Sequence, residues 1–235
     1  MRRGFFIGAA ALVGGLLLAS YAMRPKPFEG VKVSSYNMAD VPRHPITEEM
    51  MSRAEARLGD QVPDLTLPST DGKDVVLREL SEKGPLVIVM TKDGCPCSIE
   101  SQPYFSQVAA AYAKDVTFLG IIEGDFRTAR KYQGDFNVPY EFAYVDSQDV
   151  FKQFGAKQSV YTYLVGKGGQ IRQIWPGYSR HSLTELNAKI ANELGKTPVI
   201  IDFSSATEEM TSGCFFFQPI GTNKPAWHDE TSSSD

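Results

Sequence analysis

A short apolar strand that ends at two closely spaced cysteines constrains this chain more than any other feature. Residues 86–90 form a continuous apolar run, which is typical of a central strand covered on both faces. Asp93-Gly94 then provides a turn. Cys95 falls at the N-cap position of a helix, and Pro96 falls at the first helical position, where its missing N–H costs nothing. The segment therefore predicts a strand, a turn and a helix that begins at the cysteines.

The start of this helix gives Cys95 an environment that favours its thiolate. Free N–H groups and the positive end of the helix dipole both stabilise an anion. Lys92 is a candidate for an additional positive charge. A single free cysteine is usually a small buried hydrophobic residue, but Cys95 and Cys97 flank Pro96 at a strand-to-helix junction. This pair indicates a redox or metal-binding role.

The composition is that of an ordinary globular domain and gives no reason to expect nucleic acid as a partner. The 235 residues carry a net charge of -4, and 42% of them are hydrophobic. Three cysteines are too few for a disulfide scaffold, and none of the usual zinc spacings occurs. Cysteine chemistry is therefore expected at Cys95 and Cys97, with or without Cys214.

The N-terminus has the features of an export signal or a membrane anchor. Arg2 and Arg3 precede about twenty uncharged residues, a length that can span a bilayer. Ser20-Tyr21-Ala22 offers a cleavage site, whereas the length favours retention as a single helix with the arginines inside. The rest of the chain is then expected on the periplasmic or exterior face of the inner membrane, or secreted if the signal is cleaved.

A second motif connects the cysteine segment to a known family. Residue 59 opens a Gly-x-x-x-Pro-Asp-Leu-x-Leu sequence, which is followed by a hairpin signal at Asp71-Gly72 in short alternating segments that extend to Leu80. With the strand that ends at a helix-starting cysteine, this pattern resembles the redoxin branch of the thioredoxin-like superfamily. That branch includes membrane-tethered thiol–disulfide proteins and AhpC/TSA-type peroxiredoxins. The resemblance implies a thioredoxin-like three-layer α/β/α sandwich with an N-terminal hairpin extension.

The remaining periodicity independently favours an α/β fold of this kind. Strands are predicted at residues 116–122, 140–145, 161–165 and 171–175, and helices at 47–58, 126–136, 150–154 and 183–194.

We expect four consecutive parts in the chain. They are a signal-anchor or transmembrane helix (1–23), a linker with a short helix (24–58), the thioredoxin-like redoxin domain (59–195) and a C-terminal tail (196–235). The tail is expected to end in disorder, but Phe215-Phe216-Phe217 needs burial and should fold back onto the domain.

The chain departs from the family pattern at two places near the site. Ser98 occupies the usual position of the second cysteine, and Cys97 comes one residue early. Val160 stands where the family places a cis proline. Because a cis bond before a non-proline residue costs about 2.5–4 kcal/mol, we expect a trans bond there. Pro96, Val160 and Lys92 are the predicted substrate contacts.

The leading hypothesis is an extracytoplasmic, membrane-tethered thiol–disulfide oxidoreductase that acts on a protein thiol or disulfide. Cys95 is the expected attacking thiolate, and either Cys97 or Cys214 resolves the mixed disulfide. Side chains two residues apart on a helix point away from each other, so a Cys95–Cys97 bond would be strained. We therefore expect Cys214 to lie beside Cys95.

Two alternatives remain open from the sequence. Cys95 and Cys97 are candidates for Cu(I) binding, with Cys214 or His181 as a further ligand, as in a metallocentre assembly protein. A peroxiredoxin-like peroxidase is the second alternative, with Arg172 or Arg180 as the candidate for holding peroxide.

Overall fold

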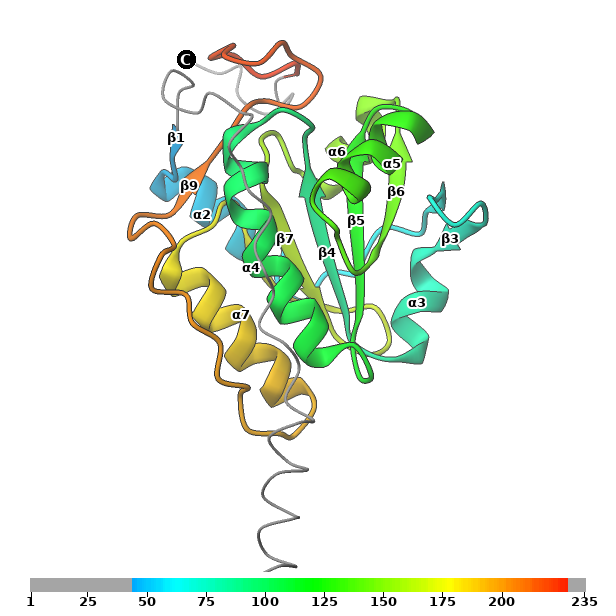
Figure 1. Ribbon diagram of the computed structural model, residues 1–235, viewed down its shortest axis with the longest axis vertical. Coiled ribbons are helices and arrows are strands. Elements are labelled where there is room, and N and C mark those ends of the chain that lie inside the picture. Colours follow the sequence, from blue (N-terminus) through cyan, green and yellow to red (C-terminus); the bar gives the residue numbers. More distant parts are fainter. Residues whose placement is uncertain (1–43, 228–235) are drawn as a thin grey trace, which may run out of the picture. The chain divides into compact units, whose positions relative to one another are not determined.

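A computed structural model describes residues 44–227, which are built around a five-stranded mixed sheet. The strands run in the order β6-β5-β4-β7-β8 (Figure 1). Their bounds are β4 Leu86–Thr91, β5 Thr117–Glu123, β6 Glu141–Val145, β7 Tyr161–Val165 and β8 Ile171–Trp175. β4 pairs in parallel with β5 and antiparallel with β7, so the predicted central position of this strand is confirmed.

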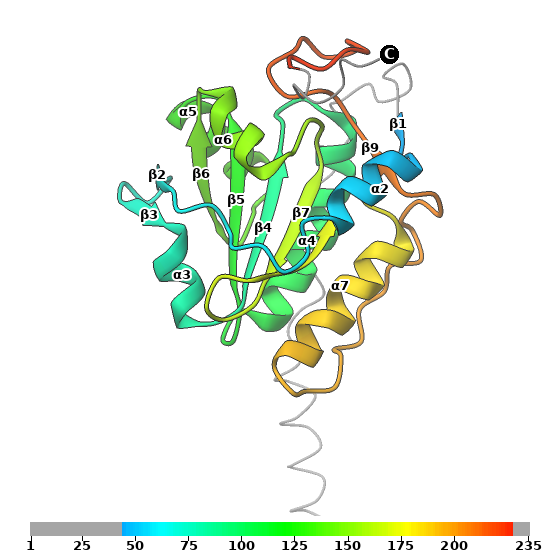
Figure 2. The same ribbon diagram turned by 180° about the vertical axis from the view of Figure 1, so that it is seen from behind.

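Helices cover both faces of the sheet (Figure 1, Figure 2). They are α2 Glu48–Glu55, α3 Leu77–Lys83, α4 Pro96–Tyr112, α5 Phe126–Asp135, α6 Gln148–Phe154 and α7 Arg180–Glu193. One apolar core joins Val87 and Val89 to α4, α5 and α7, and a second joins Leu86, Ile88 and Met90 to α2, α3 and α6. Successive side chains of β4 thus point to opposite faces. The predicted three-layer α/β/α sandwich is confirmed.

The hairpin predicted around Asp71-Gly72 is also present. β2 Thr66–Pro68 pairs antiparallel with β3 Asp74–Val76, and Gly72 has a φ of +84° in the connecting turn. The prediction that short alternating segments extend to Leu80 was wrong, because α3 begins at Leu77. Leu77 and Leu80 are three residues apart, a spacing that places both on one face of a helix.

After α7 the chain returns along the domain, beside α7 in both views (Figure 1, Figure 2). No helix or strand is assigned between α7 and β9 Thr211–Ser212, which pairs antiparallel with β1 His44–Pro45. Phe203 and Ala206 are buried in the core that contains α4 and α7. The described part of the tail, residues 196–227, therefore packs on the domain.

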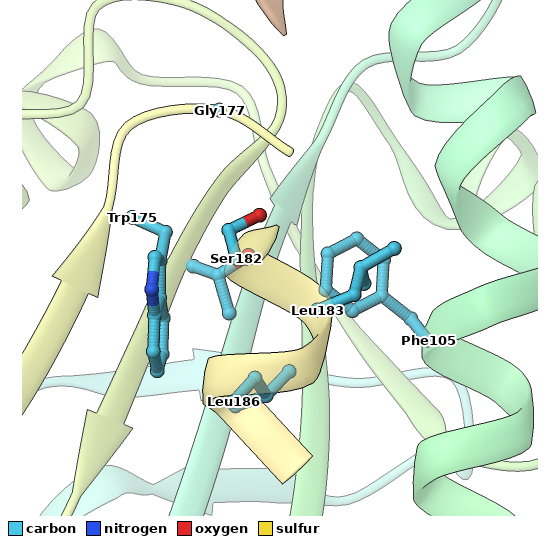
Figure 3. A pocket seen from close by; sticks show the side chains of 7 residues that line it. Phe105, Trp175, Gly177, Ser182, Leu183 and Leu186 are labelled. Atoms are coloured by element: carbon cyan, nitrogen blue, oxygen red, sulfur yellow. The ribbon is translucent and has the colours of Figure 1, made fainter. Parts of the chain in front are cut away.

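The core between α4, α7 and β8 is tightly filled. Phe105 comes from α4, Leu183 and Leu186 from α7, and Trp175 from β8, and their side chains line one narrow gap (Figure 3). The remaining space is too small for a water molecule. This gap is therefore a feature of packing and not a ligand cavity.

Candidate active site

Cys95 is the N-cap residue of α4, as the sequence predicted. Its backbone is extended, with a φ of -76° and a ψ of 124°, and Pro96 begins the helix. The preceding turn is closed by the Cys95 N–H, which donates to the Lys92 carbonyl at 3.2 Å. Gly94 in this turn has a φ of +75°, which glycine adopts readily. The turn therefore holds Cys95 at the carboxyl end of β4.

Hydrogen-bond donors surround the sulfur of Cys95. The Ser159 hydroxyl donates to it at 2.8 Å, and the Cys214 backbone N–H donates at 3.2 Å. Burial of Cys95 would by itself raise its pKa, but bonds from the Cys214 and Cys97 thiols and the Ser159 hydroxyl hold the pKa of Cys95 well below its usual range. Cys95 is therefore the cysteine of this site that loses its proton most readily.

Cys97 and Cys214 retain their protons beside Cys95. Their hydrogen bonds to Cys95, together with burial and its negative charge, raise the pKa of both thiols. Cys97 Sγ also lies 2.9 Å from the carbonyl oxygen of Ser212, which is a second acceptor within reach of the single thiol proton. All three cysteines are free. The prediction that Cys214 lies beside Cys95 is confirmed, and the site contains all three cysteines.

The tail reaches the site antiparallel to the loop before β7 and meets this loop in an isolated β-bridge between Gln158 and Phe215. The Ser159 N–H donates to the Cys214 carbonyl at 3.1 Å, and the Ser159 carbonyl accepts from the Gly213 N–H. The Phe216 N–H donates to the Lys157 carbonyl at 3.0 Å. Figure 1 shows the orange segment of the tail crossing near the start of α4. Backbone pairing therefore positions Cys214 over Cys95.

The peptide bond between Ser159 and Val160 is cis, so the predicted trans bond is wrong. An isolated peptide bond before a non-proline residue strongly prefers the trans form. In this structure the bond is not isolated, because the tail binds both the N–H and the carbonyl of Ser159. Val160 and Pro96, two of the predicted substrate contacts, are both buried in this structure.

Gly213 allows the tail to approach the cysteines very closely. A Cβ atom at this position would lie 2.2 Å from Cys95 Sγ and 3.0 Å from Cys97 Cβ. Neither distance is compatible with an ordinary van der Waals contact, and the nearer neighbour is the reactive sulfur. Only glycine therefore fits between the tail backbone and the two cysteines.

The positive charge expected beside Cys95 is paired elsewhere. The ammonium of Lys92 forms an ion pair with Glu123 at the end of β5, and the two side chains are only 6% and 17% exposed. The other carboxylate oxygen of Glu123 accepts the backbone N–H of Phe217. Lys92 therefore connects β4 to β5 and, through Glu123, to the tail.

The other candidates from the sequence do not join the cysteines. Arg172 pairs with Glu193 and Arg180 pairs with Glu208, so both arginines considered for peroxide binding are engaged in other contacts. His181 is exposed on α7. Within residues 44–227, no group of three or more His, Cys, Asp or Glu side chains is arranged to hold a metal ion. Copper binding by Cys95 and Cys97 alone is not tested by this finding and stays a prediction.

Ser159 and Gly213 contact the cysteines in the structure, although the sequence did not predict them as site residues. Ser159 immediately precedes the position compared with the family proline, but no local pattern marks its hydroxyl as a donor to Cys95. Gly213 was visible as part of Gly213-Cys214, and a glycine before a candidate redox cysteine is a usable signal for close backbone approach. The contacts of both residues depend on how the tail folds.

Comparison with known proteins assigns the family of the domain. Residues 58–174 match the model of the AhpC/TSA family. These residues belong to that family. Peroxiredoxin bcp1 of Schizosaccharomyces pombe is 25% identical over 121 residues, which are 51% of this chain and 59% of the relative. The chain thus spans about six-tenths of the length of this curated relative.

Solved structures share the fold of this AhpC/TSA domain. An uncharacterized conserved protein from Geobacillus kaustophilus has a TM-score of 0.54 and 21% identity, over 69% of this chain and 93% of its own. A protein classed as the thiol:disulfide interchange protein DsbE from Chlorobium tepidum has a TM-score of 0.54 and 21% identity, over 59% and 98%. A protein classed as a thioredoxin from Neisseria meningitidis has a TM-score of 0.52 and 21% identity, over 60% and 93%. The thioredoxin-like fold predicted from the sequence is confirmed.

The membrane prediction concerns a different part of the chain. Among residues 44–227, no helix has the length and apolar character needed to cross a bilayer. The predicted anchor at residues 1–23 lies outside the described residues, as do most of the linker and His228.

Proposed function

We propose that this redoxin is a thiol–disulfide oxidoreductase in which Cys95 is the nucleophile and Cys214 is the resolving cysteine. The observation that carries the proposal is the arrangement at α4, where a low-pKa Cys95 accepts hydrogen bonds from the thiol and the backbone N–H of Cys214. A thiolate is the reactive form of cysteine, and a neighbouring protonated thiol is in place to complete the exchange.

The exchange proceeds in two balanced steps. The Cys95 thiolate attacks one sulfur of a partner disulfide, which forms a mixed disulfide and releases the second partner sulfur as a thiolate. Cys214 then loses its proton and attacks the Cys95 sulfur, which forms the Cys95–Cys214 disulfide and releases the first partner sulfur. The partner gains two electrons and the redoxin loses two. The same steps in reverse oxidise a partner dithiol.

The remaining polar groups stabilise the sulfur on which charge accumulates. When Cys95 becomes a leaving group, negative charge develops on its sulfur. Hydrogen bonds that the Ser159 hydroxyl and the Cys97 thiol donate to this sulfur stabilise that charge. A leaving thiolate of lower pKa leaves faster. We assign Ser159 and Cys97 to this stabilising role.

The pH dependence of Cys95 reactivity tests this function directly. The reduced protein is treated with 5,5′-dithiobis(2-nitrobenzoate), and modification of each cysteine is followed by mass spectrometry. The account predicts that modification of Cys95 follows a pKa clearly below the free-thiol value of about 8.5, and that Cys95→Ser removes this phase. A Cys95 phase with the free-thiol pKa would contradict the proposal.

Peroxide reduction is a second candidate, because Cys95 is completely buried. A small oxidant reaches such a sulfur more easily than a protein disulfide does. Peroxide would convert the Cys95 thiolate to a sulfenic acid and hydroxide, and the Cys214 thiol would then form the disulfide with loss of water. Peroxide consumption with dithiothreitol as reductant separates the two functions. A Cys95-dependent turnover at micromolar peroxide would favour the peroxidase.

We also propose an extracytoplasmic location, with the chain held at the membrane by residues 1–23 and acting on protein thiols or disulfides there. The support is the sequence pattern alone, in which two arginines precede an uncharged segment. Fractionation of cells that express the full chain tests this proposal. Protein found only in the cytoplasmic fraction would contradict it.

A further inference from the structure

We infer that residues 212–217 occupy the binding site for an extended, cysteine-containing segment of the redox partner, and that this partner segment has the pattern Gly-Cys-x-aromatic. The inference rests on the proposed thiol–disulfide exchange. It adds that the site is closed in the resting protein and that the tail itself shows which partner sequence fits.

The first observation is that the tail seals the reactive sulfur. Cys95, Cys97 and Cys214 are 0%, 1% and 2% exposed. The backbone of residues 213–216 lies along the loop before β7, directly over Cys95. A protein disulfide cannot contact Cys95 in this arrangement. Exchange with a protein therefore requires the tail to leave.

The second observation is that backbone groups form much of the contact. Lys157 and Ser159 offer three backbone groups, and residues 213–216 satisfy all three. Backbone pairing of this kind can be formed by any extended segment, and strand addition is a common mode of peptide recognition. When the tail leaves, these groups lose their partners. A partner segment that adds as a strand would restore the same bonds.

The third observation concerns the side chains of the tail, which define what fits. The residue before the cysteine must be glycine, since a Cβ at position 213 would lie 2.2 Å from Cys95 Sγ. The cysteine itself lies at hydrogen-bond distance from that sulfur. Two residues later, Phe216 is fully buried, and its ring centroid lies 4.2 Å from that of Phe151. These three positions give the pattern Gly-Cys-x-aromatic.

The attachment of the tail is consistent with release. The segment between α7 and β9 has no assigned helix or strand, and Ile200 within it is completely exposed. On one side of the site, Thr211 exchanges backbone bonds with Tyr178 and β9 pairs with β1; on the other side, the Phe217 N–H donates to Glu123. Release of residues 213–216 would break their bonds to Lys157 and Ser159 but would leave the five-stranded sheet intact, because these residues are not part of that sheet.

The claim that the tail blocks access to Cys95 is tested on the reduced full-length protein. Gly213→Ala places a methyl group against Cys95 and should dislodge the tail, so alkylation of Cys95 by iodoacetamide should rise about tenfold or more. Gly134→Ala is the matched control, because nothing lies within 4 Å of a Cβ at that helical position. Phe216→Ala removes the aromatic anchor by a different route and should act in the same direction. Equal Cys95 alkylation in wild type and in both tail variants would overturn the inference.

Peptide selectivity tests the predicted pattern. The peptide Ser-Gly-Cys-Phe-Phe-Phe, with its cysteine in a mixed disulfide with glutathione, is reacted with wild-type protein and with Gly213→Ala. Replacing its glycine or its second phenylalanine by alanine should slow mixed-disulfide formation at Cys95 by about tenfold. Equal rates for all three peptides would overturn the inference. If Cys95 reacts with 5,5′-dithiobis(2-nitrobenzoate) but does not discriminate among the three peptides, only the inference fails. If Cys95 does not react with 5,5′-dithiobis(2-nitrobenzoate) in wild type or in Gly213→Ala, the proposed function fails.

Discussion

At the scale of single residues, the site depends on the competition between burial and hydrogen bonding at Cys95. Removing a sulfur from water disfavours its charged form, and Cys95 is completely buried. The opposing contribution comes from donors that all point at one sulfur, namely a hydroxyl, a backbone N–H and two thiols. Because the pKa of Cys95 is lowered, the donors outweigh the burial.

The clearest test of this balance is Ser159→Ala. The substitution removes the hydroxyl that donates to Cys95 at 2.8 Å. Hydrogen bonds to charged groups contribute about 1.5–3 kcal/mol, so the pKa of Cys95 should rise and its reactivity at neutral pH should fall about tenfold or more. The pH–rate profile of Cys95 modification measures this change. Ser52→Ala on the exposed face of α2 is the control, and an unchanged profile in Ser159→Ala would show that the hydroxyl does not stabilise the thiolate.

The stability of the reduced protein should depend on pH through the same thiols. The pKa of Cys95 is lowered by folding, so its contribution is complete above the unfolded-state pKa of about 8.5 and is lost as pH falls through its folded-state pKa. The pKa values of Cys97 and Cys214 are raised, so their contribution is complete below about pH 8.5 and is lost at higher pH.

The free energy of unfolding should therefore pass through a maximum near pH 8.5. Urea denaturation under reducing conditions, at several pH values from neutral to strongly alkaline, measures the curve. Cys95→Ser removes the lowered pKa and most of the cause of the two raised ones, so its curve should be flatter. A wild-type curve that is as flat as that of Cys95→Ser would contradict the assignment of charges.

At the scale of elements, the site is assembled from β4, α4, the loop before β7 and the tail. The Lys92–Glu123 ion pair links the ends of β4 and β5, and Glu123 also binds the tail at Phe217. Removing one partner of a buried pair leaves the other charge uncompensated. This pair is therefore a connection whose loss should affect both the sheet and the tail.

Lys92→Met tests this connection. We expect a loss of about 3–5 kcal/mol in the free energy of unfolding, because the substitution leaves Glu123 with no cationic partner. Lys131→Met is the control, since Lys131 pairs with Asp135 on the exposed surface of α5 and its loss should cost less than about 1 kcal/mol. Equal effects of the two substitutions in urea denaturation would show that the Lys92 pair is not stabilising.

The elements themselves were largely predictable because most of them carry a local signal. The continuous apolar run predicts β4, and Cys95-Pro96 predicts the start of α4. α3 was missed because a short alternating pattern and a short helical pattern share the same leucines. The pairing of β1 with β9, and the contact of residues 213–216 with the loop before β7, join parts of the chain that are far apart in the sequence. No local periodicity encodes such contacts.

At the scale of the whole molecule, a thioredoxin-like AhpC/TSA domain has its own C-terminal tail over its reactive cysteine. Hydrophobic periodicity was enough to predict the α/β sandwich, and the position of Cys95 at a helix N-terminus was enough to predict its role as the thiolate. The third cysteine was placed correctly because three phenylalanines follow it and require burial. The cis bond before Val160 and the role of Ser159 could not be predicted, because both belong to the contact between the tail and the loop before β7.

The central claim is that Cys95 and Cys214 form the redox pair, and disulfide mapping tests it most directly. The protein is oxidised with one equivalent of a disulfide oxidant, blocked with iodoacetamide, digested without reductant and analysed by mass spectrometry. The account predicts a Cys95–Cys214 crosslink with alkylated Cys97. A Cys95–Cys97 crosslink with Cys214 always alkylated would contradict it.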